Sequence, residues 1–209
     1  ATMAIEKSIS TRLRDISEDA IDQGLKKIGD AVDSRRKKRR ITTYQQAEIL
    51  SRLSHGKELV GLERCGGVLE AVVERLDVKR SVLAEIAPLL AKNAIFATNT
   101  SALSVTAIQK DSPVADRVVG LHFFNPVPKM PLVEVIPGEF TDPQVVGIAL
   151  SLARKLGKYP VIVKDSPGFL VNRLLLPYLD AASRLLLKGL SGSHIDEVAR
   201  AHGLPMGPF

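Results

Sequence analysis

The stretch Val68–Thr98, VLEAVVERLDVKRSVLAEIAPLLAKNAIFAT, decides the fold class of this chain. It begins with the apolar run Val68–Val73 and ends with a second one, Ala94–Thr98, and such runs are typical of buried strands. Between them the spacing of apolar residues predicts a helix from about Val78 to Leu90. A strand, a helix and a second strand in this order form the unit from which parallel sheets are built.

The same alternation continues on both sides of this stretch. Upstream, Arg12–Arg14 is a candidate strand, followed by a predicted hairpin of two helices, 17–38 and 43–53, the first of them capped by Ser17. Downstream, the predicted elements are three strands and one helix: Arg117–Phe124, Leu132–Ile136, Pro160–Val163 and, before the last strand, helix Pro143–Lys155. We therefore expect a three-layer α/β domain over residues 1–165, with a mainly parallel sheet and helices on both faces.

The pattern changes after Lys164, where the predicted strands stop. The Leu-rich stretch Gly168–Lys188 predicts one long helix, which Pro177 is able to kink, and Ser193–His202 predicts a shorter one. Residues 166–209 are therefore expected to begin a second, all-helical domain.

Composition excludes several classes of protein. Hydrophobic residues make up 45% of the 209 residues and charged residues 25%, as in an ordinary globular protein. No apolar stretch reaches the ~18 residues of a membrane span, and the N-terminus lacks the ordered regions of a signal peptide. Cys65 is the only cysteine, so no internal disulfide is expected and a reducing compartment is favoured. No metal site is expected.

Six consecutive basic residues, Arg35–Arg40, account for the uneven spread of the net charge of +6. Three interpretations stay open: a solvated helix face, a patch for anionic phosphates, or a patch for nucleic acid or nuclear import. Aromatic residues are only 4% of the chain, and single-strand binders interleave them with basic residues. We therefore expect no nucleic-acid partner.

Polar side chains gather where predicted strands end. One group is Asn99–Leu103, a second is His122–Pro126 with Glu134 further on, and a third is Asp165–Phe169, which leads to Asn172–Arg173. In open α/β sheets this edge is where ligands bind.

Four motifs resemble, in order and spacing, the signatures of the 3-hydroxyacyl-CoA dehydrogenase family. They are NTSAL at 99–103, GLHFFNPVPKMPLVEVI at 120–136, KDSPGFLVNRLL at 164–175 and GLPMGPF at 203–209. The resemblance extends from about Ile5 to Phe209. NTSAL and MPLVEVIPGE look closest to the multifunctional enzymes of fatty-acid β-oxidation, in which the dehydrogenase follows an enoyl-CoA hydratase domain.

The resemblance implies a dinucleotide-binding, Rossmann-like fold and an enzyme that oxidises (S)-3-hydroxyacyl-CoA to 3-oxoacyl-CoA with NAD. Its substrate would be an acyl-CoA, and its partners a second copy of itself or a thiolase subunit. Its location would be the cytoplasm of a bacterium, or a eukaryotic organelle of fatty-acid oxidation.

His122 and Glu134 are the candidate proton-handling pair. Removing a hydride from a secondary alcohol also requires a base for the hydroxyl proton, and histidine suits this step. Glu134 lies in an otherwise apolar strand, where burying a carboxylate without a partner is costly. The resemblance implies that these two residues form a His–Glu dyad. The alternative is that Glu134 pairs with Lys129 or Arg173.

The resemblance also implies roles for smaller polar residues. Ser101 and Asn172 would hydrogen-bond the substrate's C3 oxygen or its thioester region, and Asn125 would help to fix His122. The alternative is turn chemistry, because Asn and Ser are common where strands end. Lys38, in the helical hairpin, falls near the position of a CoA-binding lysine.

Cofactor contacts are implied in the same way. Asp15 would accept the adenosine ribose hydroxyls and select NAD, although Arg12 and Arg14 beside it suit a 2′-phosphate. The remaining residues implied to lie beside the cofactor are Glu74, Lys79, Asn99, Ser101 and Asn125. Taken alone, Glu74 and Lys79 are exposed charges at a strand-to-helix turn.

The chain departs from the family pattern near its N-terminus. The G-x-G-x-x-G loop precedes the ribose-binding acid by ~20 residues, which counted back from Asp15 lies before residue 1. Ala4–Ile9 then matches the end of the first helix, with Ser8 in the place of a capping glycine. Lacking the central strand and phosphate loop, these residues are expected to bind NAD poorly. The helices that follow Phe209 in the family are also missing.

Two other functions are consistent with these residues. One is a dehydrogenase of a hydroxy acid without CoA, and the other is a non-catalytic module that binds CoA or a protein partner.

A second departure from the family pattern is the pair Gly66 and Gly67 at the start of a predicted strand, where the family has an acidic residue. Two glycines there are expected to loosen the sheet.

Overall fold

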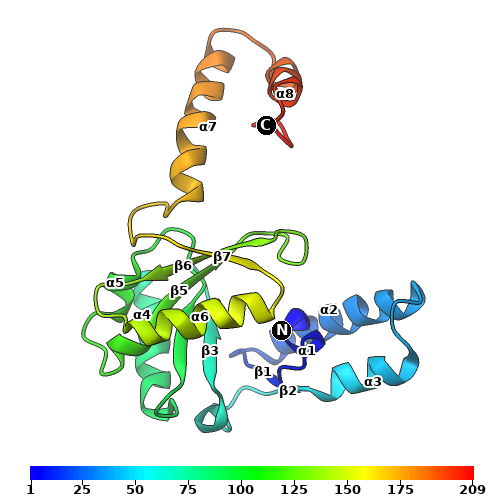
Figure 1. Ribbon diagram of the computed structural model, residues 1–209, viewed down its shortest axis with the longest axis vertical. Helices are drawn as coiled ribbons and strands as arrows, with labels where there is room; N and C mark the ends of the chain where they lie inside the picture. Colours follow the sequence, from blue (N-terminus) through cyan, green and yellow to red (C-terminus); the bar gives the residue numbers. More distant parts are fainter.

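The computed structural model describes all residues from Ala1 to Phe209. An α/β domain is followed by two helices that project from it (Figure 1). The strands are β1 Thr11–Leu13, β2 Leu53–His55, β3 Gly67–Glu70, β4 Ile95–Thr98, β5 Val118–Phe123, β6 Leu132–Pro137 and β7 Tyr159–Ile162. The helices are α1 Thr2–Glu6, α2 Glu18–Lys37, α3 Thr43–Ser51, α4 Leu76–Ile86, α5 Val105–Gln109, α6 Pro143–Lys155, α7 Val171–Leu187 and α8 Gly192–Ala201.

The main sheet has five strands in the order β3-β4-β5-β6-β7. All neighbouring pairs in it are parallel except β5 and β6, which are antiparallel. Helix α6 lies on one face and α4 and α5 on the other (Figure 1). The prediction of a mainly parallel sheet covered on both faces is confirmed.

Alternate residues of the buried strands explain this layering. In β4, Ile95 and Ala97 pack with α6, whereas Phe96 between them packs with α4 and α5. Successive side chains of a strand point to opposite faces, so a continuous apolar run supplies both cores at once. Gly120 of β5 lets α5 pack closely on the sheet, because a Cβ at this position would lie only 2.8 Å from the Val105 side chain.

A second, two-stranded sheet of β1 and β2 lies beside α1, α2 and α3. Strand β1 pairs with β2 alone and β3 with β4 alone, so no strand of residues 1–209 joins the two sheets. Sequence reasoning expects the strand of the glycine loop at this place. Helices α1, α2 and α3 share a small core of Ile5, Ile28, Val32 and Ile49.

Several predicted boundaries were wrong. The helix expected to reach Leu53 ends earlier, because Leu53–His55 pairs with β1 as strand β2. The strand expected to reach Val73 ends at Glu70, where the N–H of Val72 turns back to the Glu70 carboxylate at 2.7 Å.

Helix α7 begins at Val171, three residues later than expected, because Gly168 and Phe169 hold left-handed φ angles of 74° and 49°. Ser17 caps α2 as predicted, accepting a hydrogen bond from Ala20. Ser8, in the expected place of a capping glycine, also has a left-handed φ of 59°. None of the helices combines the length and the apolar character that a membrane span requires.

Candidate active site

His122 and Glu134 face each other across the antiparallel strands β5 and β6. They are opposite in the register, and His122 Nδ1 lies 2.6 Å from Glu134 Oε2. The histidine is 7% exposed and the glutamate fully buried. Neither Lys129 nor Arg173 pairs with Glu134, so the expected His–Glu contact is confirmed and the alternative pairing is wrong.

The contact defines the tautomer of His122. A carboxylate only accepts hydrogen bonds, so Nδ1 carries a proton, and in the neutral imidazole the free lone pair is on Nε2. The ring of Phe124, 4.5 Å away between centroids, and that of Phe169, at 5.9 Å, hold the imidazole from its sides. The imidazole of His122 is therefore fixed in orientation and mostly buried.

Glu134 has a second task that the sequence did not reveal. Its Oε1 accepts hydrogen bonds from the backbone N–H groups of Leu170 and Val171, each at 2.9 Å. These groups belong to the start of α7, where a carboxylate also interacts favourably with the helix dipole. One buried carboxylate thus holds the imidazole and the first turn of the projecting helix.

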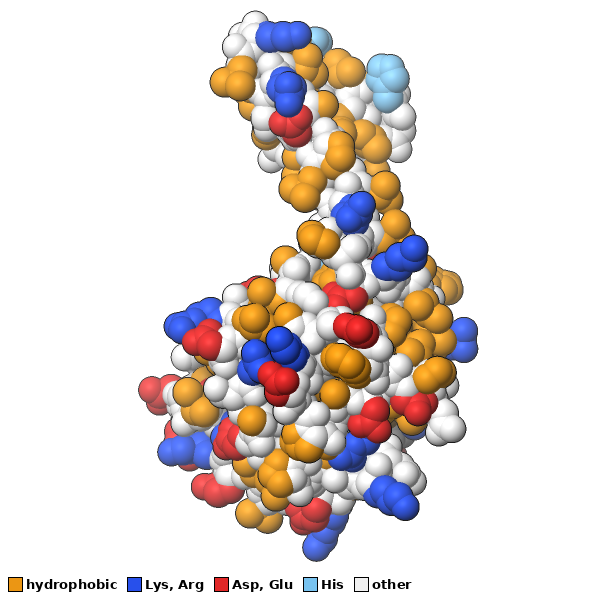
Figure 2. Space-filling view, turned by 90° about the vertical axis from the view of Figure 1, so that its left-hand side faces the viewer, with side chains coloured by type: hydrophobic (Ala, Val, Ile, Leu, Met, Phe, Trp, Pro, Cys, Tyr) orange, Lys and Arg blue, Asp and Glu red, His pale blue; other side chains and the backbone are white.

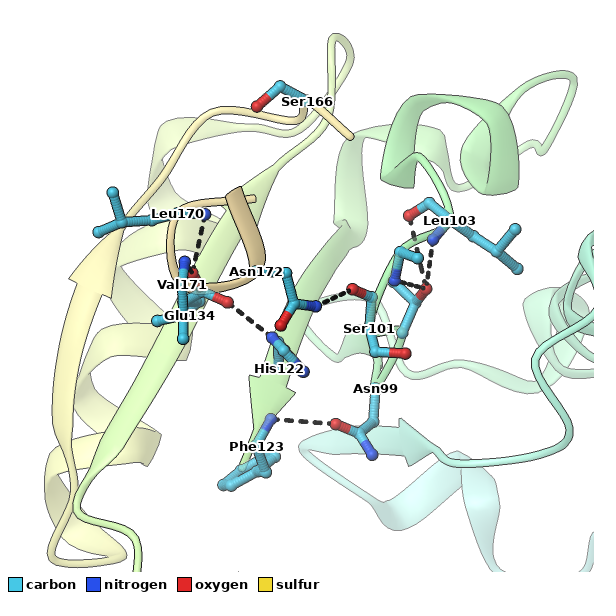
Figure 3. Close-up of polar contacts among 12 residues, drawn as sticks. Asn99, Ser101, Leu103, His122, Phe123, Glu134, Ser166, Leu170, Val171 and Asn172 are labelled. Atoms are coloured by element: carbon cyan, nitrogen blue, oxygen red, sulfur yellow. Dashed lines mark hydrogen bonds and ion pairs between the residues drawn. The ribbon is translucent and has the colours of Figure 1, made fainter. Parts of the chain in front are cut away.

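Ser101 and Asn172 meet beside His122 (Figure 3). The Asn172 side-chain nitrogen donates to the Ser101 carbonyl oxygen over 3.0 Å. Ser101 follows β4 and Asn172 lies in the first turn of α7, so the contact joins the sheet to the helix. The structure therefore brings together all four residues predicted to be catalytic: Ser101, His122, Glu134 and Asn172.

Glu74 holds the loop that carries Ser101. Its Oε1 accepts hydrogen bonds from Thr100 Oγ1 at 2.6 Å, from the N–H of Ser101 at 2.8 Å and from the N–H of Ala102 at 3.2 Å. Partial burial raises the pKa of the Glu74 carboxyl, but these hydrogen bonds and the charge of Lys79 outweigh it, and the pKa lies below its ordinary value. Glu74 is more than a solvated charge at a turn.

Lys79 is also not an exposed charge. Its side chain is fully buried, and Nζ lies 2.8 Å from Glu70 Oε1 and 3.3 Å from Glu74 Oε2. Sequence reasoning missed Glu70, whose only signal was an acidic residue inside an apolar strand. That Lys79 and Glu74 also touch the cofactor stays a prediction.

Asn99 and Asn125 differ in their surroundings. The Asn99 side-chain oxygen accepts the N–H of Phe123 at 3.1 Å, which ties the end of β4 to the end of β5. Asn125 precedes a cis peptide bond to Pro126 and makes no hydrogen bond to His122. Glu134 and the neighbouring rings hold His122, and the expected role of Asn125 toward His122 and the cofactor stays a prediction.

Asp15 and Lys38 lie away from this cluster, on the β1–β2 side of the molecule. Asp15 is exposed just after β1, where its carboxylate accepts the N–H of Ser17 at 3.2 Å. The neighbouring Arg14 is engaged by the Lys57 carbonyl and by Glu85. Lys38 is exposed at the tip of the α2–α3 hairpin, which in Figure 1 points away from α7.

Comparison with known families covers almost the whole chain. Residues 1–166 match the family model of the 3-hydroxyacyl-CoA dehydrogenase NAD binding domain, and residues 168–209 match that of the C-terminal domain. A fatty acid oxidation complex subunit alpha of Idiomarina loihiensis is 39% identical over 99% of this chain. One from Pseudomonas savastanoi is 41% identical over 94% of the chain. The chain spans 29% and 27% of these two relatives, respectively.

Solved structures agree with this assignment. A (S)-3-hydroxybutyryl-CoA dehydrogenase from Ralstonia eutropha superposes with a TM-score of 0.94 at 35% identity, covering 99% of this chain and 74% of the other. A 3-hydroxybutyryl-CoA dehydrogenase from Escherichia coli gives a TM-score of 0.94 at 36% identity, with 99% of this chain and 44% of the other covered. The chain belongs to the 3-hydroxyacyl-CoA dehydrogenase family.

Proposed function

We propose that the protein containing this chain oxidises (S)-3-hydroxyacyl-CoA to 3-oxoacyl-CoA with NAD, and that His122 takes the hydroxyl proton. The buried 2.6 Å contact between His122 and Glu134 carries this proposal, because it leaves Nε2 as an acceptor beside Ser101 and Asn172. In the proposed reaction, proton transfer to Nε2 forms an imidazolium that the Glu134 carboxylate stabilises.

Ser101 and Asn172 orient the substrate in this proposal. Ser101 follows β4 and Asn172 lies in α7, both beside His122, so they suit a substrate whose C3 oxygen and thioester carbonyl need separate hydrogen bonds. The Glu74 carboxylate holds the backbone of Ser101 in place, which keeps the loop from adapting to a misplaced substrate.

The residues of this chain fit two ends of NAD. The exposed Asp15 carboxylate after β1 suits the ribose hydroxyls, and the edge formed by Asn99 and Ser101 suits the nicotinamide end. The glycine loop that binds the pyrophosphate is not among these residues, so no phosphate contact is assigned. When bound, NAD supplies the acceptor for the hydride.

We propose two further features of the whole protein. Its helical domain begins at residue 166. The protein also assembles with a thiolase subunit, since its relatives are named as subunits of a fatty acid oxidation complex.

The basic α2–α3 hairpin with Lys38 would bind the phosphates of CoA.

A second candidate is a dehydrogenase of hydroxy or dicarbonyl compounds without CoA. A diketoreductase structure matches with a TM-score of 0.90 at 29% identity, covering all of this chain and 76% of the other. That diketoreductase catalyses reactions of dicarbonyl compounds.

Turnover by the full-length protein with NAD decides between these functions. We expect NADH to form with (S)-3-hydroxyacyl-CoA, but hardly with the (R) enantiomer or the free hydroxy acid. Faster turnover of the free acid would favour the second candidate. No NADH from any of these substrates would overturn both proposals.

A further inference from the structure

A buried ion pair lies next to the proposed active site without belonging to the His122–Glu134 dyad. Lys79 and Glu70 have side-chain exposures of 0% and 1%, and Lys79 Nζ lies 2.8 Å from Glu70 Oε1. Both oxygens of Glu70 are fully engaged, since Oε1 also accepts the N–H of Val72 at 2.7 Å and Oε2 accepts Thr98 Oγ1 at 2.6 Å. The ammonium group of Lys79 is therefore held by a rigid acceptor.

Fold stability does not account for such a pair. Removing two charges from water costs about as much as their attraction returns, and apolar side chains of similar volume often stabilise a fold better. The pair joins the end of β3 to the first turns of α4, and the same place would suit apolar packing. A further role for the charges has to be sought in what Lys79 contacts.

Lys79 continues toward the active site through a second carboxylate. Its Nζ lies 3.3 Å from Glu74 Oε2, and the other oxygen of Glu74 accepts the N–H groups of Ser101 and Ala102. The Ser101 carbonyl in turn accepts the side-chain amide of Asn172 at 3.0 Å. A connected series of hydrogen bonds and ion pairs thus runs from β3 to α7.

We infer that Glu70 is a positioning residue, which fixes the loop 99–103 through Lys79 and Glu74, and through this loop Asn172. The inference rests on the proposed function of Ser101 and Asn172. Without the Glu70 charge, Lys79 has only Glu74 as an ion partner and is drawn toward it. Glu74 then shifts, and the backbone of Ser101 loses its alignment with α7.

A double-mutant cycle in the full-length protein tests this connection. Glu70→Gln keeps the size of the side chain and one acceptor oxygen, but it removes the charge and replaces the other acceptor oxygen with an amide donor. We expect Glu70→Gln and Asn172→Ala each to lower kcat by about tenfold, and the double variant by about tenfold instead of a hundredfold. Residues 70 and 172 do not touch, so independent effects would multiply, and a hundredfold loss would overturn the inference.

A measurement without substrate separates positioning from stability. Amide hydrogen exchange of Ser101 and Ala102 in the full-length protein is expected to be at least several-fold faster in Glu70→Gln, with the β5 amides unchanged. Glu48→Gln is the matched control, because it makes the same change in an exposed ion pair with Arg52 and should leave these rates unaltered. Thr98→Val keeps every charge and serves if Glu70→Gln does not fold. It should show a smaller change in the same direction.

Glu70→Gln alone leaves the buried charge of Lys79 without the Glu70 carboxylate. The double variant Glu70→Gln/Lys79→Met removes both charges of the pair. We expect its thermal stability to recover, while the exchange of Ser101 and Ala102 stays fast. Recovery of slow exchange together with stability would show that the pair has only a structural role and would overturn the inference. If the wild-type protein forms no NADH while Ser101 and Ala102 still exchange faster in Glu70→Gln than in wild type, the proposed function fails and the connection from Glu70 to Ser101 stands.

Discussion

Glu134 is shared between two parts of the molecule. One oxygen accepts the imidazole N–H of His122, and the other accepts two backbone N–H groups at the start of α7. The position of α7 therefore depends on the same carboxylate that fixes the tautomer of His122, the proposed base. This double use explains how an acidic residue is tolerated inside an apolar strand, because both of its oxygens accept hydrogen bonds.

Replacing Glu134 by alanine is expected to lower the free energy of unfolding by roughly 3–5 kcal/mol, because it leaves His122 and two N–H groups without their buried acceptor. Glu134→Gln retains an acceptor oxygen for Leu170 and Val171 and should cost much less. Urea unfolding of the two variants checks this. If Glu134→Ala and Glu134→Gln lose the same free energy of unfolding, the hydrogen bonds from Glu134 to the start of α7 do not stabilise the fold.

The lowered pKa of Glu74 predicts how stability depends on pH. Its ionised form is favoured in the folded protein, so its contribution is present above the ordinary value of 4.5 and is lost as the pH falls through the lowered one. Glu74→Gln should therefore flatten the decline of unfolding free energy in acid. Parallel declines of wild type and Glu74→Gln in chemical denaturation series would contradict this.

The individual residues of the site were predictable to different degrees. His122 stands out at the end of an apolar strand, Glu134 inside one and Asn172 in a Leu-rich helix, whereas the role of Ser101 was implied by the family resemblance. Glu70 and the burial of Lys79 were missed, because their contact joins β3 to α4 and depends on how the helix packs. Sequence spacing gives no measure of that packing.

At the scale of elements, Asp165 connects the segment between β7 and α7 to α5. Its carboxylate accepts the N–H groups of Val105 and Thr106, at 3.0 and 2.8 Å, and the hydroxyl of Ser104 at 2.8 Å. The start of α5 is thus capped by a residue 60 positions away from Val105. Together Asp165 and Glu134 fix both ends of the segment that leads into α7.

Asp165→Ala is expected to destabilise the protein by about 1–2 kcal/mol, because it removes a cap shared by two backbone N–H groups. Asp165→Asn keeps an acceptor oxygen and should lose less than half of that. Thermal or urea unfolding measures both. If the free energy of unfolding of Asp165→Ala equals that of wild type within error, water replaces the carboxylate at the start of α5 without loss of stability.

The elements with clear periodicity were predicted well, as for α6 and strands β4 to β7. Helix α5 was not predicted, because its five residues are too few for a periodic pattern and Asp165, which caps it together with Ser104, is distant in sequence. Strand β2 was not predicted and its first residue, Leu53, was assigned to a helix, since three residues carry no alternation and only pairing with β1 defines the strand.

At the scale of the whole molecule, the chain consists of parts with unequal cores. The main sheet has clusters of 13 and 9 buried hydrophobic residues on its two faces, whereas the α1–α3 and β1–β2 part has a cluster of 4. Helices α7 and α8 project from the sheet and expose apolar side chains, among them Leu174 at 68% and Leu187 at 88% (Figures 1 and 2).

Unequal cores predict unequal local stability in this chain. The N–H groups of Thr11 and Gly56, which are hydrogen-bonded in the β1–β2 sheet, should exchange with solvent at least tenfold faster than those of the buried strand β5. Native-state hydrogen exchange followed by NMR measures this. Equal protection of the two sheets would show that they unfold as one cooperative unit.

The central claim is that His122 acts as the base because Glu134 fixes its protonated nitrogen, and kcat of NADH formation tests it most directly. In the full-length protein, Glu134→Gln presents an amide N–H to His122, which favours the tautomer with its proton on Nε2. We predict that kcat with (S)-3-hydroxyacyl-CoA then falls by about 10²–10⁴-fold, whereas Glu48→Gln leaves it unchanged. A Glu134→Gln variant that turns over at the wild-type rate would contradict the account.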